Sequence, residues 1–130
     1  MRITFYGGAM SVTGANYLLD FGSTKILVDC GLFQGSKYAE SLNYADFQYN
    51  PKEIDYVFIT HSHIDHIGRT PKLFKDGFRG KIFTTEPTRA LMERAFPDNW
   101  SLIAKEAKEE GHPPLYSLED IASTMKLVEG

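Results

Sequence analysis

The chain has 130 residues, of which 42% are hydrophobic and 24% are charged, and this average balance excludes a disordered or fibrous protein. Its length suits a single domain or part of a larger one. The formal net charge of −3 excludes a globally basic protein, so any binding of nucleic acid must depend on a local site.

The first third of the chain predicts β-structure. Three short runs rich in β-branched, aromatic and aliphatic residues are separated by glycine-containing turns: RITFYGG, NYLLDF and TKILVDC. Gly22 and Ser23 stand where a tight hairpin turn would join the last two runs. The next segment, SKYAESLNYADF, has too weak a periodicity to predict more than a short helix or a loop. IDYVFIT is then a continuous apolar run, which is typical of a strand covered on both faces.

Helical signals follow the fourth strand. Thr70 is expected to cap a helix that has Pro71 at its first position and Gly77 beyond its end. One more strand is predicted at KIFTT. A helix should then begin at about Pro87, and Pro97 should interrupt it, so that NWSLIAKEAKEEG forms a separate helix.

The C-terminal segment predicts one more helix, because Ser117 and Asp120 have the spacing of a capping box. Strands followed by helices predict an α/β or α+β layered fold. The single cysteine, Cys30, has no partner for an internal disulfide and is expected to be a buried thiol. No segment approaches the roughly 20 apolar residues that cross a bilayer. We therefore expect a cytoplasmic protein.

Three of the four histidines lie in HSHIDH, residues 61 to 66. His61 and His63 are two residues apart just beyond a predicted strand, so in extended backbone their side chains project to the same side. Asp65 and His66 follow where the chain turns, and they can point back toward a second ion. Imidazole and carboxylate are zinc ligands, and two ions about 3.5 to 4 Å apart can hold a hydroxide. The pattern therefore predicts a metal site.

Other interpretations of these residues stay open. Any one histidine at a strand end can be an ordinary hydrogen-bonding or surface residue. A structural zinc site is a second alternative, although such sites favour cysteine ligands and Cys30 lies far upstream. Asp29, at the end of ILVD, is either the acceptor for the second ring proton of a ligand histidine or an ordinary turn residue. His112 is interpreted as a loop residue.

Two further groups of side chains are expected to be structural. The only basic cluster is interpreted as a solvated helix face and turn rather than a phosphate-binding track: Lys72, Lys75, Arg79 and Lys81. Contacts with substrate are the alternative for three residues whose ordinary roles are structural: Gln34, Ser11 and Arg69.

HSHIDHIGR, residues 61 to 69, resembles the second motif of the metallo-β-lactamase superfamily, and Asp29 in LVDCG matches its first motif. Two longer stretches resemble the β-CASP branch, which comprises RNA- and DNA-processing nucleases similar to ribonuclease J and to cleavage-and-polyadenylation nucleases: VTGANYLLDFGSTKILVDCGLFQG and THSHIDHIGRTPKLFKDGFRGKIFTTEPT. The resemblance covers Met1 to about Thr88 and continues more loosely through PPLYSLEDIASTMKLVE. It implies that residues 1–130 are the N-terminal half of an αββα sandwich, a partial metallo-β-lactamase domain.

The resemblance also implies roles for the motif residues. His61 and His63 would bind one zinc ion, and Asp65 and His66 would bind the other. Asp65 would handle the proton of the attacking water, and Asp29 would support the site, so these two residues are the expected catalytic side chains. Family members hydrolyse phosphodiesters through a metal-bound hydroxide, and RNA, or else DNA, is the expected substrate of the complete enzyme.

The family's remaining metal ligands, two histidines and a bridging aspartate, are expected beyond Gly130. Each ion would then have two protein ligands here, below the three typical of catalytic zinc, so partial zinc occupancy is expected. The bared apolar face of a half-sandwich should also promote self-association. Two other functions remain open, namely hydrolysis of a small ester or thioester and a non-catalytic interaction module derived from the nuclease.

Overall fold

The computed structural model describes residues 1–8 and 13–130, and within them six strands form one mixed sheet in the order β1-β2-β3-β4-β5-β6. The strands are β1 (Arg2–Phe5), β2 (Tyr17–Asp20), β3 (Lys25–Val28), β4 (Tyr56–Phe58), β5 (Lys81–Phe83) and β6 (Val128–Glu129). The first three pair antiparallel, whereas β3, β4, β5 and β6 pair in parallel. The layered α/β class predicted from the sequence is confirmed.

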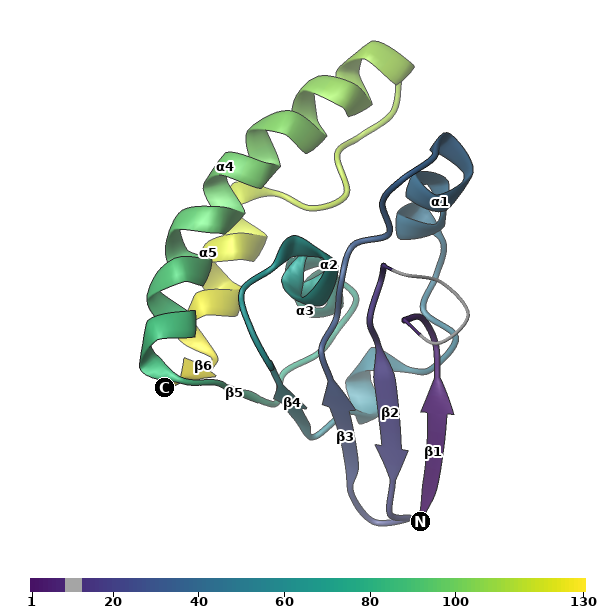
Figure 1. Ribbon diagram of the computed structural model, residues 1–130, viewed down its shortest axis with the longest axis vertical. Coiled ribbons are helices and arrows are strands. Elements are labelled where there is room, and N and C mark those ends of the chain that lie inside the picture. Colours follow the sequence, from purple (N-terminus) through teal and green to yellow (C-terminus); the bar gives the residue numbers. More distant parts are fainter. Residues whose placement is uncertain (9–12) are drawn as a thin grey trace.

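Helices follow β3, β4 and β5 along the chain, and β6 comes last, as Figure 1 shows. They are α1 (Lys37–Ser41), α2 (Ile64–Ile67), α3 (Thr70–Lys75), α4 (Glu86–Glu110) and α5 (Leu118–Lys126), with 3-10 turns η1 (Leu42–Tyr44) and η2 (Pro51–Glu53). Helix α5 packs against α3 and α4, and α4 also contacts β6. None of the described helices is both long enough and apolar enough to span a bilayer.

Local signals predicted several elements correctly. The β2–β3 hairpin turns at Gly22, which has φ 90° and donates its backbone N–H to Asp20 Oδ1 over 2.8 Å. Helix α5 begins with the capping box, in which Ser117 N donates to Asp120 Oδ2 over 2.9 Å and Asp120 N donates to Ser117 Oγ over 3.1 Å. Both features satisfy backbone groups within a few residues, which is why the sequence alone reveals them.

The prediction that Pro97 ends a helix is wrong, because α4 runs without a break from Glu86 to Glu110. A proline inside a helix removes one hydrogen bond and costs about 3 kcal/mol. Met92 and Phe96 before it, and Ile103 after it, are buried in the core. Since each such side chain stabilises by about 1.5 to 3 kcal/mol when buried, packing on both sides of the proline outweighs the lost bond.

The predicted cap of α3 is displaced by one residue. Arg69 is the N-cap, and Thr70 is the first helical residue, with its hydroxyl donating to Ile67 O over 2.7 Å. Pro71 therefore occupies the first turn, and Gly77, with φ 117°, follows the end of the helix as predicted. The Thr70 hydroxyl therefore donates back to a carbonyl of α2 and does not cap the backbone N–H groups of α3.

One face of the sheet packs on the helices and the other is bare. The buried face carries one residue from each of five adjacent strands, Leu18, Leu27, Val57, Ile82 and Val128, which belong to a single core with helical side chains. On the opposite face, large apolar side chains remain substantially exposed: Ile3 47%, Phe5 61%, Tyr56 38% and Phe58 43%. The expectation that IDYVFIT forms a strand covered on both faces is therefore wrong, because Val57 points to the core while its neighbours point outward.

Candidate metal centre

The candidate site forms where the parallel strands β3 and β4 end. Asp29 directly follows β3, and its N–H donates to Phe58 O, the last residue of β4, over 2.8 Å. Because both strands run the same way, the segments after them emerge at the same edge of the sheet. This pairing places Asp29 beside Thr60 and His61, more than thirty residues away in the sequence.

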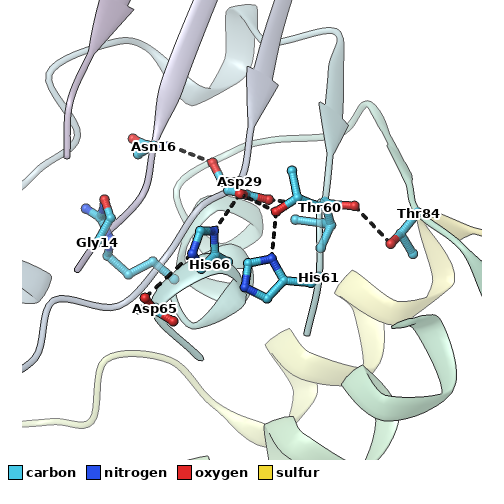
Figure 2. Close-up of polar contacts among 10 residues, drawn as sticks. Gly14, Asn16, Asp29, Thr60, His61, Asp65, His66 and Thr84 are labelled. Carbon is cyan, nitrogen blue, oxygen red and sulfur yellow. Dashed lines mark hydrogen bonds and ion pairs between the residues drawn. The ribbon is translucent and has the colours of Figure 1, made fainter. Parts of the chain in front are cut away.

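Asp29 is the buried acceptor of the site, with 1% of its surface exposed. Its Oδ1 accepts from Thr60 N over 2.7 Å, and its Oδ2 accepts from the Thr60 hydroxyl over 2.7 Å. The same Oδ2 lies 2.7 Å from Nδ1 of His66 (Figure 2). Since a carboxylate offers only acceptors, His66 Nδ1 carries the proton of that bond, and in the neutral ring Nε2 then has the free lone pair. The sequence left Asp29 as either the acceptor for a ligand histidine or an ordinary turn residue. The structure places its carboxylate against a histidine, in agreement with the first interpretation.

The backbone conformation of Asp29 is unusual. Its φ of 62° lies in the left-handed region, the only such value for a non-glycine residue in the described part of the chain. Aspartate and asparagine tolerate this conformation better than other side chains do. The Asn16 side chain holds the turn by donating from Nδ2 to Asp29 O over 2.9 Å. The turn thus aims the carboxylate inward at the histidine segment.

The three motif histidines lie together. The ring centroids of His61 and His66 are 4.0 Å apart, and those of His61 and His63 are 4.8 Å apart. Asp65 Oδ2 lies 3.6 Å from His66 Nε2. His63 is exposed and the other three side chains are partly exposed. All four predicted ligands are therefore neighbours on one solvent-accessible surface at the end of β4.

Asp65 and His66 lie on the four-residue helix α2, which backbone bonds hold against the segments before β2 and after β3. Cys30 N donates to His66 O over 2.9 Å, and Ala15 N donates to Asp65 O over 3.0 Å. Gly31 makes this approach feasible, because a Cβ at this position would stand 1.6 Å from Asp65 O. Gly31 is a site residue that sequence reasoning missed; the glycine in LVDCG was its only signal.

The donor types fit zinc, since neutral imidazole and carboxylate are its ordinary ligands and the contact of His66 Nδ1 with Asp29 leaves Nε2 as the ring nitrogen that could bind a metal. Within residues 1–8 and 13–130, however, no group of three or more His, Cys, Asp or Glu side chains is arranged so that it could hold a metal ion. The structure therefore shows the ligand types gathered but not converged on one point.

Cys30 and His112 take no part in this cluster. Burial raises the pKa of the Cys30 thiol to about 11, so the thiol is protonated and inert at neutral pH. This agrees with the prediction of a buried thiol. The Pro113 carbonyl and then the Glu110 carboxylate raise the pKa of His112, which lies after α4 and is far from the other histidines in sequence.

Of the three candidate substrate contacts, Arg69 has structural partners for its side chain. Arg69 is 5% exposed, donates to the carbonyl oxygens of Gly31 and Gly14, and stacks on the Phe33 ring at 4.5 Å. Gln34 is exposed, and its backbone N–H donates to Thr13 Oγ1 over 2.9 Å. Ser11 lies outside the described residues.

The basic cluster is not a uniformly solvated face. Lys72 is only 6% exposed, its ammonium donates to Ala45 O, and burial lowers its pKa, so the solvated interpretation is wrong for this residue. The other three residues are exposed, as the solvated interpretation predicted. Their side chains also have partners: Lys75 reaches Leu115 O at 3.5 Å, Arg79 donates to Phe74 O and Phe78 O, and Lys81 lies 3.7 Å from Glu129.

Together the fold and the site define a layered α/β protein with a histidine-rich candidate metal centre at the carboxyl ends of its parallel strands. A comparison with protein families matches residues 12–115 to the Metallo-beta-lactamase superfamily. The chain belongs to this superfamily, as its HSHIDH motif predicted.

Curated relatives are similar to most of this chain but are much longer. Ribonuclease TTHA0252 of Thermus thermophilus is 40% identical over 96% of this chain, which spans 27% of that protein. Transcription termination factor FttA of Methanosarcina mazei is 38% identical over 84% of the chain and 17% of its own length. Cleavage and polyadenylation specificity factor 73 of Drosophila melanogaster is 32% identical over 99% of the chain and 18% of its own length. These relatives agree with the predicted resemblance to the N-terminal portion of a β-CASP nuclease.

Solved structures support the fold. BJP-1, a subclass B3 metallo-β-lactamase of Bradyrhizobium japonicum, has a TM-score of 0.51 at 24% identity, covering 70% of this chain and 33% of that one. A Cronobacter sakazakii metallo-β-lactamase variant has a TM-score of 0.52 at 21% identity, covering 71% and 34%. The metallo-β-lactamase fold predicted from the sequence is confirmed for this part of the chain.

Proposed function

We propose that this chain is the N-terminal metal-binding portion of a cytoplasmic RNA-processing nuclease that hydrolyses phosphodiester bonds, with residues 1–130 a partial metallo-β-lactamase domain. The observation that carries the proposal is the buried Asp29 carboxylate directed at His66 within a cluster of three histidines and Asp65. The names of the relatives, a ribonuclease among them, support RNA as the substrate.

In the proposed site His61 and His63 would hold one zinc ion, and Asp65 and His66 would hold a second. Bound zinc would lower the pKa of water and stabilise the charge that develops on the phosphate. Asp65, which is partly exposed beside His66, would take the proton of the attacking water. Asp29 would act through His66 by fixing its tautomer, and it touches no reacting atom.

The function is tested with the polypeptide extended to the length of its relatives, assayed on 5′-labelled RNA and on a thioester. We expect cleavage of RNA alone. The His61→Ala variant should lose at least about 100-fold in kcat/KM, because it removes a metal ligand. His112→Ala is the matched control and should keep full activity, since His112 lies outside the cluster. Turnover of the thioester alone would contradict the nuclease, and turnover of neither would favour an interaction module.

Zinc binding by the 130-residue chain is expected to be weak. Two protein ligands for each ion are fewer than the three typical of catalytic zinc, so dialysis should leave much less than two zinc ions per chain. The metal content after dialysis is measured by atomic emission, with the His61→Ala variant as the baseline. Two tightly retained zinc ions would contradict this expectation.

Self-association through the bare face of the sheet is expected at micromolar concentrations. Phe5 and Phe58 are the anchors of this face, because contiguous exposed apolar surface promotes association. Sedimentation velocity should therefore show oligomers that Phe5→Ser and Phe58→Ser reduce. Leu91→Ser is the control, since Leu91 is 53% exposed but lies on helix α4. A wild-type monomer with cooperative unfolding would refute the prediction.

A further inference from the structure

The Thr60 hydroxyl lies between the buried carboxylate and a second histidine. Thr60 Oγ1 is 2.7 Å from Asp29 Oδ2 and 3.0 Å from Nδ1 of His61, as Figure 2 shows. Asp29 Oδ2 therefore contacts His66 directly and His61 through one hydroxyl group. Neither the motif comparison nor the pairing of Asp29 with His66 assigns any role to Thr60.

Proton counting decides the direction of these bonds. A hydroxyl has one proton to donate and lone pairs to accept with, whereas a carboxylate has only acceptors. The short contact with Asp29 therefore uses the Thr60 proton. The remaining contact, to His61, then requires Nδ1 of the ring to donate to Thr60 Oγ1. A neutral imidazole that carries its proton on Nδ1 leaves Nε2 unprotonated.

We propose that Thr60 is a positioning residue that transmits the acceptor character of Asp29 to His61, so that one buried carboxylate sets the tautomers of two histidines. His66 is set directly and His61 through the hydroxyl, and each ring, when neutral, then presents the Nε2 lone pair. The proposal deepens the proposed metal site, but the tautomers themselves do not depend on a metal.

The backbone supports this role. Thr60 N donates to Asp29 Oδ1 over 2.7 Å, so the residue is tied to the carboxylate by two bonds and its side-chain rotamer is constrained. Ile59, the preceding residue, is held by Thr84, whose hydroxyl donates to Ile59 O over 3.1 Å. Thr60 itself is exposed, so loss of its hydroxyl opens no cavity in the core. The side chain can therefore be changed without unfolding the protein.

The test is long-range ¹H–¹⁵N correlation spectroscopy of the imidazoles in the metal-free 130-residue chain. The pH is set above the ordinary imidazole pKa of about 6.5, so that the rings are observed in their neutral form. In the wild type we expect both His61 and His66 to carry the proton on Nδ1. Thr60→Val should remove this preference at His61 and leave His66 unchanged. Thr60→Ser, which keeps the hydroxyl, should restore the wild-type pattern.

Two results would overturn the proposal. One is a wild-type His61 protonated on Nε2, which requires no variant to fold. The other is a Thr60→Val spectrum in which His61 keeps its Nδ1 proton. Titration with zinc of the polypeptide extended to the length of its relatives, as wild type and with the same two substitutions, tests the metal site separately: Thr60→Val should weaken binding by about 10- to 100-fold, the effect expected when the partner of a ligand histidine is lost. Absence of zinc binding in every protein, with the predicted tautomers present, would count against the metal site alone.

Discussion

Replacement of Asp29 by alanine is expected to lower the free energy of unfolding by about 3 kcal/mol or more, because each donor left without its acceptor costs about 1 to 3 kcal/mol. The substitution deletes the acceptor for two donors of Thr60 and for the ring of His66. It also leaves alanine at a φ of 62°, which adds about 1 kcal/mol of strain. Urea unfolding followed by the fluorescence of Trp100 measures the change.

Asp29→Asn separates the backbone effect from the loss of acceptors. Asparagine tolerates the left-handed conformation and keeps one acceptor oxygen. Its NH₂ group replaces the second carboxylate oxygen, and this group cannot accept a hydrogen bond from the donor that the oxygen served. We expect a loss of about 2 kcal/mol, between the wild type and Asp29→Ala. A free energy of unfolding for Asp29→Ala within about 1 kcal/mol of the wild-type value would show that the carboxylate does not hold the site together.

Gly31→Ala is expected to destabilise the protein by about 4 kcal/mol or more, or to prevent folding, because the new Cβ would collide with backbone atoms of Asp65 and not with a flexible side chain. The added Cβ would stand 1.6 Å from the backbone oxygen of Asp65, so helix α2 would have to move away from the segment after β3. That movement breaks the bonds from Ala15 N to Asp65 O and from Cys30 N to His66 O. Thermal and urea unfolding provide the measurement.

Gly111→Ala is the matched control for Gly31→Ala. Gly111 ends helix α4 with φ 79°, and a Cβ there meets nothing within 4 Å. Its replacement should cost only the strain of the left-handed conformation, about 1 to 2 kcal/mol. Equal losses for the two variants would show that the close approach at Gly31 contributes nothing beyond ordinary glycine flexibility. A displaced α2 in the Gly31→Ala protein should also broaden the imidazole signals of His66.

The HSHIDH motif was readable from the sequence because its spacing is a local property. The hairpin at Gly22 and the capping box of Ser117 were predicted for the same reason, since each satisfies backbone groups only a few residues away. Patterns of this kind require no knowledge of which segments meet.

Where sequence reasoning failed, distant contacts decided the outcome. Pro97 remains inside α4 because buried Phe96 and Ile103 hold the helix on both sides of it. Lys72, interpreted as a solvated cation, is buried because its ammonium reaches the carbonyl of Ala45 from another element. Strand β6 has only two residues and was not predicted, because its pairing with β5 rather than its length defines it.

By itself the amino-acid sequence determined the layered α/β class, the superfamily and the identity of the four candidate ligands. It left two readings of Asp29 open and gave no role to Thr60 or Gly31. Only the parallel pairing of β3 with β4 brings Asp29 to Thr60 and His66, across 31 and 37 positions of sequence. Hydrogen-bond direction and close backbone approach depend on which segments meet in space, and that is a property of the folded chain alone.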